Sequence, residues 1–319
     1  MLRRLAAVLG TAFLGAAGLT AVAPAAHADA ACASFSSTTA TCVNSTATIA
    51  GTSYSVDWYL PNGTASALML LNHGFSRDCA NLRGTSKAIV EKGVMVLCVN
   101  ADMSSGNPTL GNDLGDALAA RALTPPSGKA LPVSYIVGGH SAGGHFASVV
   151  GARLAADGYA GLKGAVLFDP VASSGFTANL AAISAGGTRP VLSVAARPSL
   201  ANLYNNSFGA LKDLDSAFVG IQLVWEKFTV GIPSGGSCHI DVEGENSDVI
   251  GIAGAGCSAN TTQTARLRDF GANWASDIAT GTRTAAYWCT DESVLSTCGS
   301  KIRDLVDRTL PVAAPIPAS

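Results

Sequence analysis

The stretch Ile136–Phe146, IVGGHSAGGHF, joins a short apolar run to a glycine-rich turn that carries a serine between two histidines. The apolar run at residues 133–138 has a strand pattern, and residues 142–156 repeat apolar side chains with helical spacing. Residues 139–143 match G-x-S-x-G, a pattern that has a mechanistic meaning only between a strand and a helix. The stretch therefore predicts that Ser141 lies on a tight strand-to-helix turn above a sheet edge, rather than in a flexible connection.

Short apolar runs alternate with helical patterns on both sides of this turn. We expect strands at residues 52–60, 67–72, 94–99, 133–138, 164–168 and 190–195, and helices at 79–92, 114–123, 142–156, 176–183 and 261–278. Residues 29–50 have an irregular pattern, 200–216 indicate a helix or a small lid, and 218–225 suit the last strand. Strands that recur between helices indicate an α/β fold, with a mostly parallel central sheet and helices on both faces.

The first 28 residues are typical of a secretory signal peptide. Arg3 and Arg4 precede an apolar run, and Ala26-His27-Ala28 has the form of a cleavage site. A membrane anchor is the alternative, although Pro24 and the cleavage triplet favour export. We expect a secreted, extracellular protein with one domain at 29–298 and a partly flexible C-terminal extension at 299–319. No other stretch approaches the ~20 apolar residues that span a bilayer.

The composition favours a globular protein without a polyanionic partner. Of 319 residues, 48% are hydrophobic and 13% charged, so one domain can bury a large core and function as a monomer. Loss of Arg3 and Arg4 with the signal peptide would leave 18 basic against 22 acidic residues. No basic run is present, and we expect no binding to nucleic acid or to an anionic membrane.

The cysteines indicate disulfides rather than a metal site. All eight follow the predicted signal peptide, and an even number in an exported protein favours disulfides. No CxxC spacing occurs, so we expect no zinc. A preference for short loops, among 105 possible connectivities, gives Cys32–Cys42, Cys79–Cys98, Cys238–Cys257 and Cys289–Cys298.

A serine hydroxyl needs a base, and the histidines leave one candidate. In chains with this strand-turn-helix motif the acid and then the histidine follow the serine. His27 leaves with the signal peptide, and His73 and His140 precede the serine. His145 follows it before any acid, so His239 is the expected base, and we expect His140 and His145 to be bystanders.

The acid is expected at the end of a neighbouring strand. The run GAVLFDPV places Asp169 at the carboxyl end of the strand at 164–168, where catalytic groups collect in open α/β sheets. The run RPVLSVAARPSL, after which many enzymes place the acid, holds no carboxylate before Asp213. We favour Asp169, with Asp213 or Asp215 as alternatives.

Two backbone N–H groups are expected to face the substrate oxygen. One belongs to Ala142, which directly follows the serine at the start of a helix. The other belongs to Phe75, or to Ser76 next in line, in the His-Gly-Phe turn that follows the strand at 67–72. His73 is then a supporting residue.

The elements NHGF, GHSAGG, FDPV and CHID together resemble the α/β-hydrolase superfamily. Within it, the chain is similar to esterases of the chlorophyllase and platelet-activating-factor acetylhydrolase type over residues 52–278. The resemblance implies Ser141 as nucleophile, Asp169 as acid, His239 as base and no cofactor. The signal peptide, the cysteines and the C-terminal extension depart from the chlorophyllase pattern, which argues against chlorophyll as substrate.

The expected activity is hydrolysis of carboxylic esters, as an esterase or lipase acting on small-molecule or lipid esters. An extracellular polyester depolymerase fits export and disulfides equally well. An acyltransferase requires the same three residues, and a non-catalytic binding protein could keep the fold. The length of the acyl chain is not encoded in any of these patterns.

Overall fold

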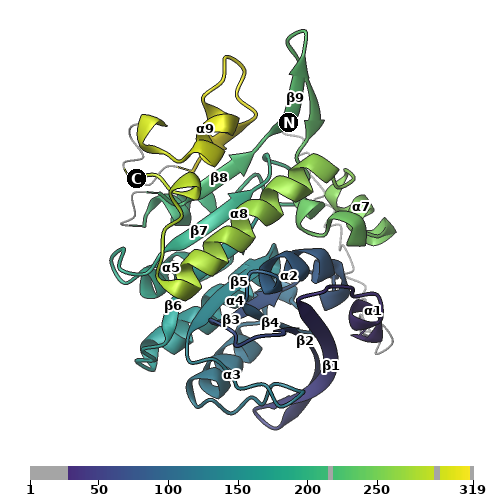
Figure 1. Ribbon diagram of the computed structural model, residues 1–319, viewed down its shortest axis with the longest axis vertical. Helices are drawn as coiled ribbons and strands as arrows, with labels where there is room; N and C mark the ends of the chain where they lie inside the picture. Colours follow the sequence, from purple (N-terminus) through teal and green to yellow (C-terminus); the bar gives the residue numbers. More distant parts are fainter. Residues whose placement is uncertain (1–27, 215–217, 291–294, 317–319) are drawn as a thin grey trace, which may run out of the picture.

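The computed structural model describes residues 28–214, 218–290 and 295–316. The predicted signal peptide, apart from its last residue Ala28, lies outside the described residues. A nine-stranded sheet runs through the centre of the molecule in the order β1-β2-β4-β3-β5-β6-β7-β8-β11 (Figure 1). Strands β3 to β8 are parallel, whereas β1, β2 and β11 run antiparallel to their neighbours.

The elements alternate along the chain as the sequence predicts. The strands are β1 (Ala40–Ile49), β2 (Thr52–Pro61), β3 (Leu68–Asn72), β4 (Met95–Val99), β5 (Tyr135–His140), β6 (Leu162–Phe168), β7 (Val191–Ala195), β8 (Gly220–Leu223), β9 (Trp225–Thr229), β10 (Ile232–Gly236) and β11 (Ala313–Pro315). The helices are α1 (Ala28–Ala33), α2 (Arg83–Val90), α3 (Pro108–Ala119), α4 (Ala142–Ala156), α5 (Phe176–Ser184), α6 (Phe208–Lys212), α7 (Val249–Ala255), α8 (Thr261–Thr280) and α9 (Ser300–Val306). Short 3₁₀ helices cover Cys79–Leu82 before α2 and His239–Val242 after β10.

Two hydrophobic cores cover the two faces of the sheet. Successive side chains of a strand point to opposite faces, so Met69 belongs to one core and Leu70 to the other. The first core includes Trp274 of α8, and the second includes Phe146 of α4. Burial on both faces explains why the central strands read as continuous apolar runs. The prediction of a mostly parallel sheet between helical layers is confirmed.

One expectation about the N-terminal region was wrong. Residues 40–49 form the edge strand β1 instead of irregular structure, and they pair with β2 along its whole length. The hairpin turn between β1 and β2 lies at Ala50-Gly51, both with positive φ. Most side chains of β1 are partly or fully exposed, so the strand lacks the apolar alternation by which a sequence reveals a strand.

The C-terminal third holds more β-structure than expected. Strand β8 ends at Leu223, and the chain then forms the β9–β10 hairpin, which projects from the body as a separate two-stranded sheet (Figure 1). Strand β11 returns from the C-terminal segment and pairs with β8 at the edge of the main sheet. Helix α6 occupies part of the 200–216 segment. None of the helices in the described ranges is long and apolar enough to cross a membrane.

Candidate active site

Ser141 lies on the turn between β5 and α4, as the sequence predicts. Its backbone has φ 56° and ψ −126°, a conformation that costs a non-glycine residue roughly 1–3 kcal/mol and recurs at functional sites. The glycines make the turn possible, because a Cβ on Gly139 would overlap the carbonyl of Gly143. A Cβ on Gly143 would overlap the carbonyl oxygen of His73. The close packing holds Ser141 in a strained position above the sheet.

The side chains of Asp169 and His239 are in contact, although the two residues are 70 positions apart in the chain. Nδ1 of His239 lies 2.6 Å from Oδ2 of Asp169, and both side chains are buried. Asp169 follows β6, the strand next to β5, so it lies at the same edge of the sheet as Ser141. The ring donates through Nδ1 to the carboxylate, which leaves Nε2 as the nitrogen able to accept a proton.

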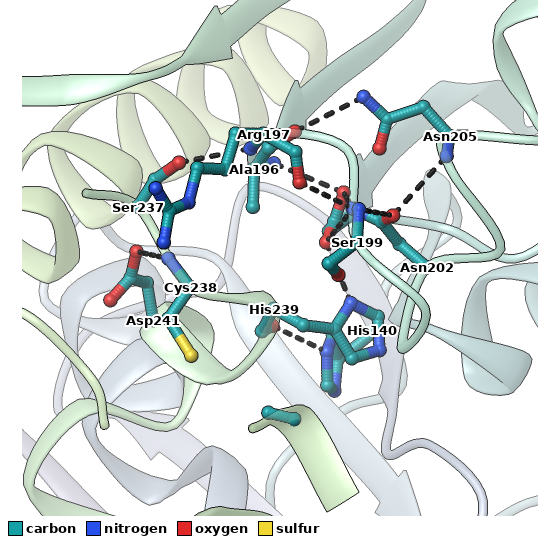
Figure 2. A network of polar contacts seen from close by, with 12 residues as sticks. His140, Ala196, Arg197, Ser199, Asn202, Asn205, Ser237, Cys238, His239 and Asp241 are labelled. Carbon is teal, nitrogen blue, oxygen red and sulfur yellow. Dashed lines mark hydrogen bonds and ion pairs between the residues drawn. The ribbon is translucent and has the colours of Figure 1, made fainter. Parts of the chain in front are cut away.

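Further donors surround the carboxylate of Asp169, and sequence reasoning missed them. The N–H of Ala196 donates to Oδ1 at 3.0 Å, and Nδ2 of Asn202 lies 3.3 and 3.1 Å from the two carboxylate oxygens. Asn202 is fully buried, and its own oxygen accepts from the N–H groups of Ser199 and Asn205 (Figure 2). An asparagine in an irregular loop has no periodic pattern, so the sequence offered no signal for its role. The alternative acid Asp213 is exposed beside α6, and Asp215 lies outside the described residues.

The His-Gly-Phe turn lies against the serine. A Cβ added to Gly74 would lie 2.9 Å from Cβ and 3.4 Å from Oγ of Ser141, so only glycine fits there without displacing the serine. Within the described residues, the N–H groups of Phe75 and Ala142 donate to no other protein group. His73 is buried and its Nδ1 donates to the carbonyl of Gly74 at 3.0 Å, while burial lowers the pKa of His73 and keeps the ring neutral. His73 thus supports the turn, as expected.

The sequence matches no protein-family model and no curated protein. Among solved structures, a thermostable esterase from Pseudomonas putida superimposes with a TM-score of 0.52 over 81% of this chain and 88% of that one, at 13% identity. A mutant of esterase rPPE in complex with (S)-Ac-CPA gives a TM-score of 0.51 with the same coverage and 13% identity. The chain has the α/β-hydrolase fold. The narrower likeness to chlorophyllases and platelet-activating-factor acetylhydrolases stays a prediction.

In the α/β-hydrolase fold of this chain, a buried ion pair joins the loop after β3 to the loop that carries His239. Arg77, two residues after Phe75, donates to both carboxylate oxygens of Glu243 at 2.8 and 2.7 Å, and to Asp248 at 2.8 Å. The side chain of Glu243 has no exposed surface. Burial raises the pKa of Glu243, and the Arg77 guanidinium opposes that rise. The charge of Arg77 therefore compensates the buried carboxylate.

All four expected cysteine pairs lie at disulfide distance. The sulfur atoms are 1.98–2.08 Å apart in Cys32–Cys42, Cys79–Cys98, Cys238–Cys257 and Cys289–Cys298. Two of these pairs flank the site. Cys79–Cys98 joins the segment after the His-Gly-Phe turn to β4, and Cys238–Cys257 encloses His239 and α7 in one loop.

His140 and His145, the two histidines beside the serine, differ in their surroundings. Nε2 of His140 lies 2.8 Å from the carbonyl oxygen of His239 (Figure 2), so His140 contacts the residue that the sequence predicts as the base. His145 packs against Phe176 at a ring distance of 5.8 Å, and in the described part of the chain no hydrogen bond joins its side chain to His239.

A second buried carboxylate shapes the loop of His239. Asp241 accepts from the N–H of Cys238 (Figure 2) and from that of Asn260, each at 2.7 Å, and so ties this loop to the start of α8. Burial raises the pKa of Asp241 to about 7. Among the described residues, no three His, Cys, Asp or Glu side chains gather as metal ligands would.

Proposed function

We propose that the protein is a secreted serine esterase that cleaves carboxylic esters through an acyl-enzyme on Ser141. The observation that carries the proposal is the 2.6 Å contact between Asp169 and His239 at the sheet edge that holds the strained Ser141. A nucleophile, an acid and a base in this chain order are the set that acyl transfer requires in the α/β-hydrolase fold. The esterase names of the structural neighbours agree with this assignment.

The chemistry proceeds in two halves. Nε2 of His239 takes the proton of the Ser141 hydroxyl as Oγ attacks the ester carbonyl, and the C=O pair moves onto oxygen. Collapse of this tetrahedral intermediate expels the alcohol, which takes the proton from His239. Water then attacks the acyl-enzyme with His239 as base, and the acid leaves as Ser141 regains its proton.

Charge develops at two places during each half. The substrate oxygen becomes negative, and the unpaired N–H groups of Phe75 and Ala142 would donate to it. The imidazole of His239 becomes positive, and Asp169 would stabilise the imidazolium while keeping its Nδ1 protonated. The donors from Ala196 and Asn202 would hold the carboxylate in its orientation toward His239.

Export is the second part of the proposal. The signal-like N-terminus and four cysteine pairs at disulfide distance support an oxidising, extracellular location. Intact mass measurement of protein recovered from culture medium would show a chain that begins at Asp29. An intracellular chain that retains Met1 and reduced cysteines would contradict export.

Ser141→Ala tests the catalytic assignment. We expect loss of p-nitrophenyl butyrate hydrolysis and of fluorophosphonate labelling, with the melting temperature within a few degrees of wild type. A variant that retains full turnover would refute the role of Ser141. Wild-type protein that is never labelled would indicate a non-catalytic binding protein, and product esters formed with an added alcohol would indicate an acyltransferase.

Exposed apolar side chains favour a water-insoluble ester, such as a polyester, as a second candidate substrate. Nine large apolar side chains that are at least 38% exposed lie in the segments after β3 and β7, in the β9–β10 hairpin and in α7. They are Phe75, Leu200, Leu203, Tyr204, Val230, Ile232, Val249, Ile250 and Ile252. We propose that these side chains form one apolar surface beside the site, because a contiguous exposed apolar surface marks an interaction site more often than scattered single residues do.

The tip of the β9–β10 hairpin allows a test that leaves the catalytic residues intact. Val230 is 97% exposed and Ile232 is 69% exposed. The double variant Val230→Ser, Ile232→Ser should adsorb less to polyester particles than wild type, with unchanged turnover of p-nitrophenyl butyrate. Val133→Ser, at a 67% exposed position on the opposite side of the sheet, is the matched control. Equal adsorption of all three proteins would remove the polyester candidate and leave the esterase assignment in place.

A further inference from the structure

His140 precedes Ser141 in the chain, and its side chain contacts the loop that carries His239. It is the last residue of β5, its side chain is 2% exposed, and Ser141 follows it directly. Nε2 of His140 lies 2.8 Å from the main-chain oxygen of His239, and the two rings are 4.5 Å apart (Figure 2). One side chain therefore connects the segment of the nucleophile to the main chain of the base.

The partner of His140 determines which nitrogen carries the proton. A carbonyl oxygen only accepts hydrogen bonds, so Nε2 of His140 must be the donor. Burial, together with the nearby His239, holds the pKa of His140 well below its ordinary value. The ring is then neutral, with its proton on Nε2 and none on Nδ1.

The other ring nitrogen of His140, Nδ1, faces the His-Gly-Phe turn. A Cβ on Gly74 would lie 3.4 Å from Nδ1 of His140, so this ring edge lies against the His-Gly-Phe turn. Nδ1 is buried and has no hydrogen-bond partner among the described residues. A charged ring would place an N–H donor there with no acceptor, which is a further reason for the neutral form.

Two anchors then fix His239. Asp169 holds the imidazole at Nδ1, and the carbonyl oxygen of the same residue accepts from His140. An anchor on the ring sets its tautomer and tilt, whereas an anchor on the main chain sets where the side chain begins. Small displacements of a catalytic group are costly, since a shift of about 1 Å can lower the rate by ~100-fold.

We propose that His140 is a positioning residue, whose Nε2–H holds the main chain of His239 at the distance that proton transfer from Ser141 requires. The inference rests on the proposed function, because it assigns His239 the role of base. A buried histidine could instead serve packing alone, as His145 does in α4 against Phe176. The hydrogen bond to the base distinguishes the two histidines.

A pair of variants of similar length tests the donor. His140→Gln keeps an N–H donor on a side chain of suitable reach, and His140→Met removes it. We expect His140→Met to lower kcat per active site by about tenfold, the effect of roughly one hydrogen bond, with KM for p-nitrophenyl butyrate unchanged. His140→Gln should recover most of that loss. Active sites are counted by fluorophosphonate labelling run to completion, so that misfolded protein does not enter kcat.

His145→Met is the matched control, because it removes an equally buried histidine from the same segment. It should lower the melting temperature and leave kcat per labelled site unchanged. Equal kcat values for His140→Met and His140→Gln would overturn the proposal, as would a similar loss of kcat in His145→Met.

A measurement on the wild-type protein keeps the test independent of folding of the variants. Histidine ¹⁵N NMR at pH 7 should show His140 as the neutral Nε2–H tautomer. A neutral ring with its proton on Nδ1 would overturn the proposal, because Nε2 could then not donate to the carbonyl oxygen of His239. Failure of the esterase assignment gives a different result, namely full turnover by Ser141→Ala.

Discussion

Arg77 and Glu243 form a bidentate ion pair, at 2.8 and 2.7 Å, across 166 residues of sequence. Arg77 belongs to the loop after β3, which carries Phe75, and Glu243 follows the 3₁₀ helix that begins at His239. The pair therefore joins the proposed oxyanion donor to the loop of the proposed base. Its carboxylate is fully buried, so each partner depends on the other for a compensated charge.

Arg77→Met should destabilise the protein by about 3–5 kcal/mol at pH 7, because it leaves the Glu243 carboxylate buried without its partner. Protonation neutralises that carboxylate, so the deficit relative to wild type should shrink as the pH falls from 7 to 5. Urea denaturation at both pH values measures this. The double variant Arg77→Met, Glu243→Gln should regain most of the stability. A double variant as unstable as the single one would contradict the explanation.

Asn202→Ala should lower kcat for p-nitrophenyl butyrate by about tenfold or more. The change removes the side-chain donor to both oxygens of Asp169, and a hydrogen bond to a charged group contributes about 1.5–3 kcal/mol. Asn206→Ala is the control within the same loop. Asn206 forms hydrogen bonds with the main chain of Ala172 and, among the described residues, none with Asp169, so this change should leave kcat intact. Similar losses in both variants would indicate a general effect of the loop.

Asp241 should make stability depend on pH. Its pKa is raised by burial to about 7, above that of an unfolded aspartate, so the folded state binds the proton more tightly than the unfolded state. The stability that this contributes is present at acidic pH and is lost as the pH rises through about 7. Asp241→Asn removes the titration. The melting temperature of wild type relative to this variant should therefore fall between pH 5 and pH 8, and a constant difference would contradict the prediction.

Removal of Cys238–Cys257 by a double change to alanine should lower both stability and kcat. Closure of a loop with a sequence separation of 19 contributes about 3 kcal/mol in the chain-entropy model, and this loop carries His239. The same change at Cys32–Cys42, with a separation of 10, should lower stability by a similar amount without lowering kcat per labelled site. Guanidinium denaturation and active-site titration give the two quantities. An unchanged kcat in the variant without Cys238–Cys257 would show that this disulfide is not needed to position His239.

The local parts of the candidate site were predictable because they depend on neighbours in the chain. A strand, a G-x-S-x-G turn and a helix follow one another within about twenty residues. Glycine is required at 139 and 143 because a Cβ there would overlap neighbouring backbone atoms. The prediction of His239 as the base came from elimination among five histidines. The cysteine pairs followed from short loops, which are the easiest to close.

The sequence by itself determined the α/β alternation, the turn of Ser141 and the chemical types available to a catalytic site. Only the tertiary structure showed that Asn202 reaches Asp169, that Arg77 reaches Glu243, and that His140 reaches the main chain of His239 across 99 residues. The same holds for β1 and β11, whose places at the sheet edges depend on partner strands rather than on their own patterns. Periodicity records which face of an element is buried, whereas a hydrogen bond between distant loops depends on how the whole chain brings those loops together.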